Sequence, residues 1–146
     1  MNPLKFVGVA KAAAALSKDP STKVGCVVVD DDGSVLSLGY NGFPRGVDDL
    51  PQRYADRDTK LIFVAHAESN AIAQAARHGV RLLGSTMVLT ALYPCMNCAK
   101  QIIQAGIKRV YAPRMSKDVN EQWKLERDRS VVMFIEAGVT VEEYGP

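Results

Sequence analysis

The sequence predicts an α/β fold with parallel strands in its C-terminal half. From residue 66 onward, helix-like and strand-like segments alternate, which is typical of parallel strands joined by helices. Earlier in the chain, two strand-like segments flank an Asp-Gly turn, which predicts an antiparallel hairpin. A length of 146 residues and a hydrophobic content of 47% suit one core, so we treat residues 1–146 as a single domain.

The first predicted element is a helix over residues 4–16. Asn2 is suited to cap this helix, and Pro3 is suited to its first turn. N–H groups in the first turn have no partner within the helix, so the missing N–H of proline costs no hydrogen bond there. Alanine, the best helix former, dominates the segment. The dipeptide Asp19-Pro20 ends it.

The hairpin and a long loop follow. The two strands cover residues 24–29 and 34–40, and the turn between them contains residues 30–33. Residues 41–63 begin with several glycines and prolines and continue with a charged stretch, which predicts a loop. Because loops of about 20 residues are uncommon inside a compact domain, we expect this one to act as a lid or binding loop.

Helices and strands then alternate to the end of the chain. Glycine follows each helix-like segment, and a glycine in the left-handed conformation commonly ends a helix. In order, the predicted elements are a helix over 65–77, a strand over 86–90, a helix over 95–105, a strand over 107–112, a helix over 123–137 and a strand over 139–141.

The charge and hydropathy patterns exclude two classes of partner. Eighteen basic and sixteen acidic residues give a net charge of +2, spread without the strong positive excess that long nucleic acid requires. The longest apolar runs, 6–10 and 12–16, are far shorter than the roughly 20 residues of a membrane-spanning helix. The N-terminus also lacks the apolar stretch of a signal peptide. We therefore expect a soluble, cytoplasmic protein that binds neither membranes nor long nucleic acid.

Two motifs carry the chemistry: His66-Ala67-Glu68 and Pro94-Cys95-Met96-Asn97-Cys98. Imidazole and thiolate groups are good zinc ligands, and a Cys-x-x-Cys turn lets two thiolates bind one ion. Both motifs fall where a loop gives way to a helix, and the positive end of the helix dipole favours anionic ligands there. With three protein ligands, a tetrahedral Zn²⁺ keeps one position for water, as in catalytic sites. Glu68 would then lie beside the metal and move protons.

Each motif alone also has a simpler interpretation. His-x-Glu is most often a pair on a surface helix, and Cys-x-x-Cys can be a redox dithiol. A closed structural zinc site needs a fourth ligand, and Cys26 and His78 are the only other cysteine and histidine. His78 would lie about 18 Å from His66 along a continuous helix, too far to share an ion. Cys26 suits a buried position in an apolar strand, although the sequence leaves its role as a fourth ligand open.

Around these motifs the chain resembles the deoxycytidylate (dCMP) deaminases, zinc enzymes with the signature H-x-E followed by P-C-x-x-C. The resemblance covers roughly residues 15–110. Its segments are SKDPSTKVG (17–25), YNGFPRG (40–46), HAESNAI (66–72), LYPCMNCAK (92–100) and QIIQAGIK (101–108).

The resemblance implies a three-layer α-β-α, cytidine deaminase-like fold with a mixed five-stranded sheet flanked by helices. It implies that His66, Cys95 and Cys98 hold Zn²⁺, and that a small-molecule nucleotide is the substrate. It also implies a homo-oligomer, either a hexamer or a smaller assembly.

The resemblance further assigns roles in the hydrolysis of dCMP to dUMP. Glu68 would take a proton from water and pass protons to N3 of the base and to the leaving amino group. The backbone N–H of Ala67 would bind the base carbonyl. Asn41 would hold the sugar, although an Asn-Gly pair is also a common turn.

After residue 110 the sequence departs from that family. Its members carry a tyrosine in an Asp-Lys-Tyr-like stretch that contacts the nucleotide, whereas residues 112–118 contain no tyrosine. Trp123 is a candidate for a stacking role in its place, although a single Trp opening an amphipathic helix is more often a core residue. Arginine binds phosphate through paired hydrogen bonds. The candidate phosphate ligands are Arg45 and Arg114, followed by Arg53 and Lys117.

Three alternatives remain beside the hydrolysis of dCMP. The same chemistry could act on a 5-substituted dCMP or on a purine nucleotide or base. A polynucleotide such as tRNA could be the substrate, although the balanced charge does not favour it. The domain could also be a zinc-stabilised binding module without catalytic activity.

Overall fold

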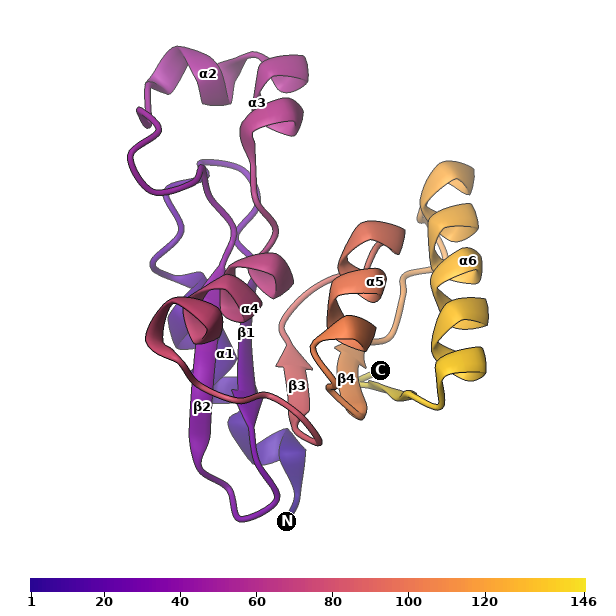
Figure 1. Cartoon of the computed structure of the whole chain (residues 1–146). Coiled ribbons are helices and arrows are strands. Elements are labelled where there is room, and N and C mark those ends of the chain that lie inside the picture. Colours follow the sequence, from indigo (N-terminus) through magenta and orange to yellow (C-terminus); the bar gives the residue numbers. More distant parts are fainter.

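A computed structural model describes all 146 residues, and its centre is a five-stranded sheet in the order β2-β1-β3-β4-β5 (Figure 1). β1 pairs antiparallel with both β2 and β3, and β3, β4 and β5 pair in parallel. The strands are β1 (Gly25–Val29), β2 (Val35–Tyr40), β3 (Thr86–Leu89), β4 (Arg109–Pro113) and β5 (Thr140–Tyr144). The hairpin, the parallel C-terminal strands and the mixed five-stranded sheet are therefore confirmed.

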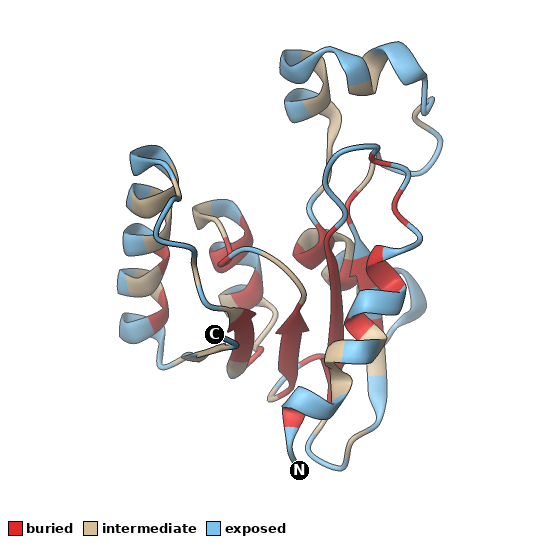
Figure 2. Ribbon diagram, turned by 180° about the vertical axis from the view of Figure 1, so that it is seen from behind, coloured by how far each residue is buried: buried red, intermediate tan, exposed pale blue.

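Helices cover both faces of the sheet. They are the 3-10 helix η1 (Pro3–Phe6) and the α-helices α1 (Val7–Ala14), α2 (Pro51–Ala55), α3 (Arg57–Phe63), α4 (Ala67–His78), α5 (Met96–Gln104) and α6 (Glu121–Ala137). In the inner strand β1, Cys26 and Val28 belong to the larger core, which α4, α5 and α6 cover. Val27 and Val29 alternate with them and pack with Ala10 of α1 on the opposite face, and Figure 2 shows the molecule from this side. These two cores confirm the three-layer arrangement.

The predicted loop over 41–63 is wrong in part, because this segment contains α2 and α3. Figure 1 shows the two short helices as an arm that extends beyond the ends of the strands. No residue of either helix is buried. Stacking of Phe43 on Tyr54, with ring centroids 4.2 Å apart, and the edge-on contact of Phe43 with Phe63 at 5.7 Å hold the arm together. The sequence did not indicate these helices because they pack on a few aromatic rings and not on the main core, so they lack the apolar periodicity of a core helix.

The other differences concern the ends of elements. The N-terminal helix begins as a 3-10 helix before α1, and the predicted cap is present, since the Asn2 side chain accepts a hydrogen bond from the N–H of Leu4. β4 begins two residues later than predicted, and β5 extends to Tyr144. α6 begins at Glu121 because the Asn120 side chain caps it, accepting from the N–H of Trp123 at 2.8 Å.

Two glycines let helices approach the sheet at backbone distance. A Cβ atom on Gly25 would lie 2.1 Å from the carbonyl oxygen of Ala10 in α1, and one on Gly39 would lie 2.3 Å from that of Ala67 in α4. Only glycine allows such contact. The first turn of α4 is therefore fixed directly against β2.

None of the helices combines the length and the apolar character needed to cross a lipid bilayer.

Candidate functional site

The carboxyl ends of three strands converge on one edge of the sheet. β2 and β3 both run antiparallel to β1, and β4 runs parallel to β3, so the segments that follow these strands meet at the same edge. Asn41 follows β2, the loop leading to Cys95 follows β3, and residues 114–120 follow β4. Such an edge is where α/β proteins place their ligand sites.

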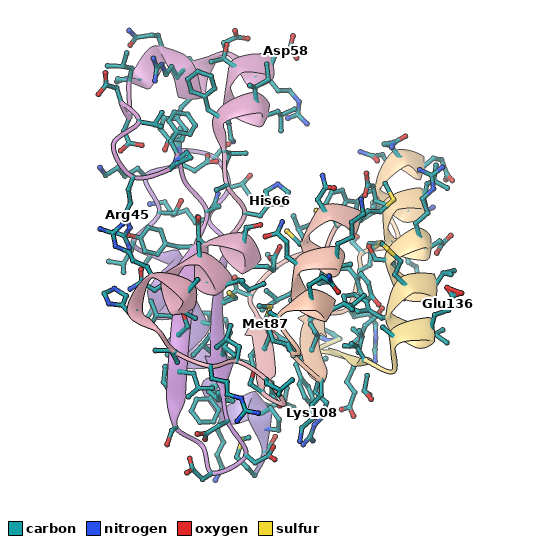
Figure 3. All side chains as sticks on the ribbon, in the orientation of Figure 1. Arg45, Asp58, His66, Met87, Lys108 and Glu136 are labelled. Atoms are coloured by element: carbon teal, nitrogen blue, oxygen red, sulfur yellow. The ribbon has the colours of Figure 1, made fainter.

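At this edge, His66, Cys95 and Cys98 form a cluster of possible metal ligands. His66 is the N-cap of α4, Cys95 is the N-cap of α5, and Cys98 lies in the first turn of α5. The Nδ1 atom of His66 lies 3.5 Å from the Sγ atom of Cys95 and 3.4 Å from that of Cys98. Figure 3 shows His66 between the N-terminal ends of the two helices.

The donor set and its spacing fit a tetrahedral zinc ion. With bonds of about 2.0 to 2.3 Å, neighbouring ligand atoms of a tetrahedral zinc site lie about 3.5 Å apart. The three ligand atoms lie within 4.8 Å of one another, and no fourth His, Cys, Asp or Glu side chain joins them. Cys26 is fully buried in the core, where its thiol donates to the carbonyl oxygen of Ala67 at 3.3 Å. The chain thus offers three ligands and leaves one position of a tetrahedral ion free.

The electrostatic environment favours a thiolate in this cluster. The hydrogen bond shared with Cys98 lowers the pKa of the Cys95 thiol to about 4, and contact with His66 acts in the same direction. The hydrogen bond with Cys95 in turn raises the pKa of the His66 imidazole. Both helices point their positive dipole ends at the cluster, which further stabilises negative charge.

Glu68 lies beside this cluster without belonging to it. Its side chain is on the first turn of α4, and the residue is only 5% exposed. Burial raises the pKa of the Glu68 carboxyl above its ordinary value. A carboxyl group with a raised pKa, next to a reacting centre, is suited to accept and return protons near neutral pH.

The cluster opens into a cavity of about 520 Å³. We call His66, Ala67, Glu68 and Cys95 its floor. We call two opposing sets of residues its rim: Arg57, Lys60 and Leu61 of α3, and Asp118, Val119, Asn120 and Trp123 at the start of α6. Between floor and rim lie Asp19, Thr22, Val24, Asn41, Val64, Leu92 and Tyr93. A cavity of this volume suits a small organic ligand.

Comparison with known proteins agrees with this geometry. A family model described as the cytidine and deoxycytidylate deaminase zinc-binding region matches residues 2–113, which include the whole cluster. The chain belongs to the cytidine and deoxycytidylate deaminase family.

Individual relatives support the same assignment. The deoxycytidylate deaminase of Mus musculus is 40% identical over 149 aligned positions, which cover 99% of this chain and 80% of that protein. A probable deoxycytidylate deaminase of Caenorhabditis elegans is 44% identical over 73% of this chain, which spans about half (54%) of that protein. The crystal structure of the dCMP deaminase of cyanophage S-TIM5 in complex with dCMP and dUMP aligns with a TM-score of 0.75 at 30% identity, covering 99% of each chain.

In this deaminase, Asn41 lines the cavity, but most of its side chain is engaged. Its Oδ1 atom accepts from the N–H of Val24 at 2.8 Å, and its Nδ2 group donates to the carbonyl of Thr22 at 2.8 Å and to Asp19 at 3.4 Å. These bonds hold the segment 19–24 against the end of β2. An amide oxygen has two lone pairs, so one acceptor site of Asn41 remains for a ligand.

Neither Arg45 nor Arg114 lines the cavity of the deaminase. Arg45 is exposed and donates to Gln74, and Figure 3 shows it on the outer side of α4, away from His66. Arg114 is also exposed, and its backbone N–H donates to the carbonyl of Tyr144 at 2.8 Å. The geometry of the single chain does not favour their assignment as phosphate ligands. Arg53 and Lys117 are likewise absent from the lining.

The basic side chains that do line the cavity are Arg57 and Lys60, which the sequence analysis missed. Residues 57, 60 and 61 share one face of α3, but no motif or apolar pattern in the sequence marks this face. Trp123 is in the lining too, so it is not simply a core residue. It lies in the part of the chain beyond the family match.

α6 also supports the floor from outside the family match. Glu126 accepts a hydrogen bond from the N–H of Met96 at 3.2 Å and so completes the N-terminus of α5 beside Cys95. Arg127 lies over the ring of Tyr93, 5.2 Å from its centroid, and pairs with Glu143 of β5. The C-terminal helix therefore contributes to both parts of the site.

Proposed function

We propose that this chain catalyses the zinc-dependent hydrolytic deamination of dCMP, in which dCMP and water yield dUMP and ammonia. The observation that carries the proposal is a cluster of three metal ligands without a fourth, next to a buried carboxyl group in an open cavity. The names of the Mus musculus relative and of the S-TIM5 structure support dCMP as the substrate.

His66, Cys95 and Cys98 would hold the zinc ion. When bound, zinc supplies a Lewis acid that makes a water molecule nucleophilic near neutral pH. The chain's own contribution would be to present one imidazole and two cysteine sulfur atoms at the required spacing. Helix N-termini behind the ligands compensate part of the negative charge of the thiolates.

Glu68 would move the protons of the reaction. It takes one proton from the attacking water and delivers it to N3 while the oxygen bonds to C4. It then transfers the remaining hydroxyl proton to the amino group, the C4–N bond breaks, and ammonia leaves with C4 as a carbonyl. Water thus supplies one oxygen and both transferred protons, and the carboxyl group ends in its starting state. Its raised pKa, caused by burial, supports both directions of transfer.

Ala67 and Asn41 would orient the base and the sugar. Ala67 is the first residue of α4, so its N–H has no partner within the helix and is free to bind the base carbonyl. Asn41 keeps one acceptor site for a sugar hydroxyl, and its other hydrogen bonds fix its position. Both groups line the same cavity as Glu68.

A substrate panel with purified, zinc-loaded protein tests the proposal, with ammonia release as the measurement. We expect dCMP to give the highest kcat/KM among dCMP, 5-methyl-dCMP, deoxycytidine, purine nucleotides and free bases. Faster turnover of a purine, or of the 5-substituted nucleotide, would show that this compound, and not dCMP, is the substrate. No turnover of any compound would favour a zinc-stabilised binding module, and tight RNA binding at low salt would favour a polynucleotide substrate.

The remaining expectations concern assembly and location. We propose a homo-oligomer, a hexamer or a smaller assembly, whose mass can be measured by light scattering. We place the protein in the cytoplasm, where reducing conditions keep thiols free. The free state of Cys26, Cys95 and Cys98 supports that location.

A further inference from the structure

One face of α3 runs along the wall of the cavity from the rim towards the floor. Arg57, Lys60 and Leu61 line the cavity at a spacing of three and four residues, which places them on the same side of α3, and Val64, directly after the helix, lines it as well. Val64 is two residues before His66, a member of the floor. At 1.5 Å per residue, the step from residue 57 to residue 64 spans about 10 Å. Arg57 is therefore the lining residue of α3 farthest along the helix from the metal ligands.

The second basic residue of this face, Lys60, is already saturated. Its ammonium group lies 3.0 and 2.8 Å from the two carboxylate oxygens of Asp19 and 2.9 Å from the hydroxyl of Ser21. A lysine has three N–H donors, so these three contacts use its whole capacity. Because Asp19 is almost completely buried, this pair is a neutral link between α3 and the segment before β1.

Arg57, in contrast, has no partner. Its guanidinium makes no hydrogen bond and no ion pair, and the residue is exposed. Its five N–H donors are all available, and a planar guanidinium matches the geometry of a phosphate group. Asp118, the acidic residue of the opposite rim, is not within ion-pair distance of it. Of the two lysine and arginine side chains in the lining, Arg57 is thus the one that is free to bind an anion.

We propose that Arg57 binds the 5′-phosphate of the substrate and makes this site select a nucleotide over a nucleoside. The proposal rests on the proposed function, because the base must occupy the floor for the phosphate to reach the rim. With the reacting carbon beside the candidate zinc ligands, the opposite end of the nucleotide would reach the rim, where Arg57 is the basic side chain without a partner. Arg57 is a specificity-determining residue that acts on the phosphate and not on the chemical step.

The test compares dCMP with deoxycytidine in zinc-loaded wild type and in the variants Arg57→Ala, Arg57→Lys and Arg77→Ala. Arg77, an exposed arginine on α4 outside the lining, is the matched control. Loss of a charged hydrogen-bonding partner predicts that Arg57→Ala lowers kcat/KM for dCMP by roughly tenfold to a hundredfold, mostly through KM. Deoxycytidine, which has no phosphate, should change less than about twofold on the same substitution. Arg57→Lys should restore part of the loss, and Arg77→Ala should resemble wild type.

Binding measurements keep this test independent of turnover. In a zinc-loaded Glu68→Gln background, calorimetry should show weaker binding of dCMP after Arg57→Ala, and binding of deoxycytidine should stay constant. An equal change for both ligands, or none for either, would overturn the proposal for Arg57 while wild-type turnover of dCMP still supports the proposed function. If wild type neither binds nor converts dCMP, both proposals are wrong. If wild type binds dCMP in a way that depends on Arg57 but does not convert it, only the proposed function is wrong.

Discussion

The floor and the rim of the cavity differ in how the protein holds them. Floor residues lie at the N-caps and first turns of helices that pack on the main core, and although His66 is exposed, Ala67 and Glu68 are only 1% and 5% exposed. Rim residues lie on the arm and at the start of α6, where Arg57, Leu61 and Asp118 are exposed. Under the proposals above, the chemical step belongs to the well-buried part of the molecule, and recognition of the phosphate belongs to a part with few buried residues.

The largest effect is expected at a metal ligand. Cys98→Ala removes a buried ligand, so the protein should lose its zinc and all measurable deamination. Metal analysis after gel filtration, together with ammonia release, measures both. Cys26→Ala is the matched control, because this buried thiol lies outside the cluster and its loss should leave the zinc content unchanged. Full zinc content in Cys98→Ala would contradict the assignment.

The second effect separates the chemistry of the floor from its metal. Glu68→Gln keeps the size of the side chain and removes its ability to carry protons. We expect kcat to fall by about two to four orders of magnitude, with zinc content and melting temperature close to those of wild type. Activity near the wild-type level would show that another group transfers the protons.

The third effect tests the rim opposite α3. Trp123→Ala removes an aromatic wall of the cavity, and loss of stacking on a base predicts a decrease in kcat/KM of roughly tenfold. Trp123→Phe should retain most of the activity, because a ring remains. Steady-state kinetics with dCMP and metal analysis distinguish this outcome from damage to the floor. If the alanine variant retains full activity, Trp123 has no role in binding the base.

The smallest effect concerns the link between the arm and the core. Burial of Asp19 opposes its ionisation, but hydrogen bonds from Lys60, Ser21 and Thr22 outweigh it, so the pKa of Asp19 lies below its ordinary value. A carboxyl group with a lower pKa in the folded chain stabilises the fold above the pKa of the unfolded chain. This stabilisation is lost as the pH falls through the folded pKa.

Asp19→Asn should therefore lower the free energy of unfolding at pH 7 by about 1 to 3 kcal/mol. It should also weaken the acid dependence of unfolding below about pH 4, the range where an unperturbed Asp titrates. Denaturant unfolding at several pH values measures both effects. Asp48→Asn, at an exposed residue without an ion pair, is the control. Parallel pH curves for wild type and Asp19→Asn would show that the pair with Lys60 contributes no stability.

The floor could be predicted from the sequence because its signals are local. His66 and Glu68 are two residues apart, and Cys95 and Cys98 are three apart. Each pair therefore lies within the N-cap and first turn of one helix. Glycines at 79 and 138 adopt the left-handed conformation that ends α4 and α6, as predicted. The antiparallel hairpin and the parallel pairing of the C-terminal strands also follow from local features, whereas the antiparallel pairing of β1 with β3 was not predicted.

The rim could not be predicted because its residues come together only in the folded chain. α3 buries no residue, so its apolar side chains show no pattern of a helix on a core, and Ile62 is 77% exposed. The lining role of Trp123 depends on where residues 114–120 return after β4, which no short motif encodes. Arg45 belongs to a recognisable motif but lies on the outer side of α4.

The bare backbone of Gly39 against Ala67 has a consequence for mutational scans of this protein. A methyl group at that strand position would displace the first turn of α4, and with it the candidate metal ligand His66, the carboxyl of Glu68 and the free N–H of Ala67. Inactivity caused by a substitution at Gly39 would therefore report on helix placement and not on any encounter with the nucleotide. Sensitivity to mutation at this strand is thus a poor guide to where a ligand sits.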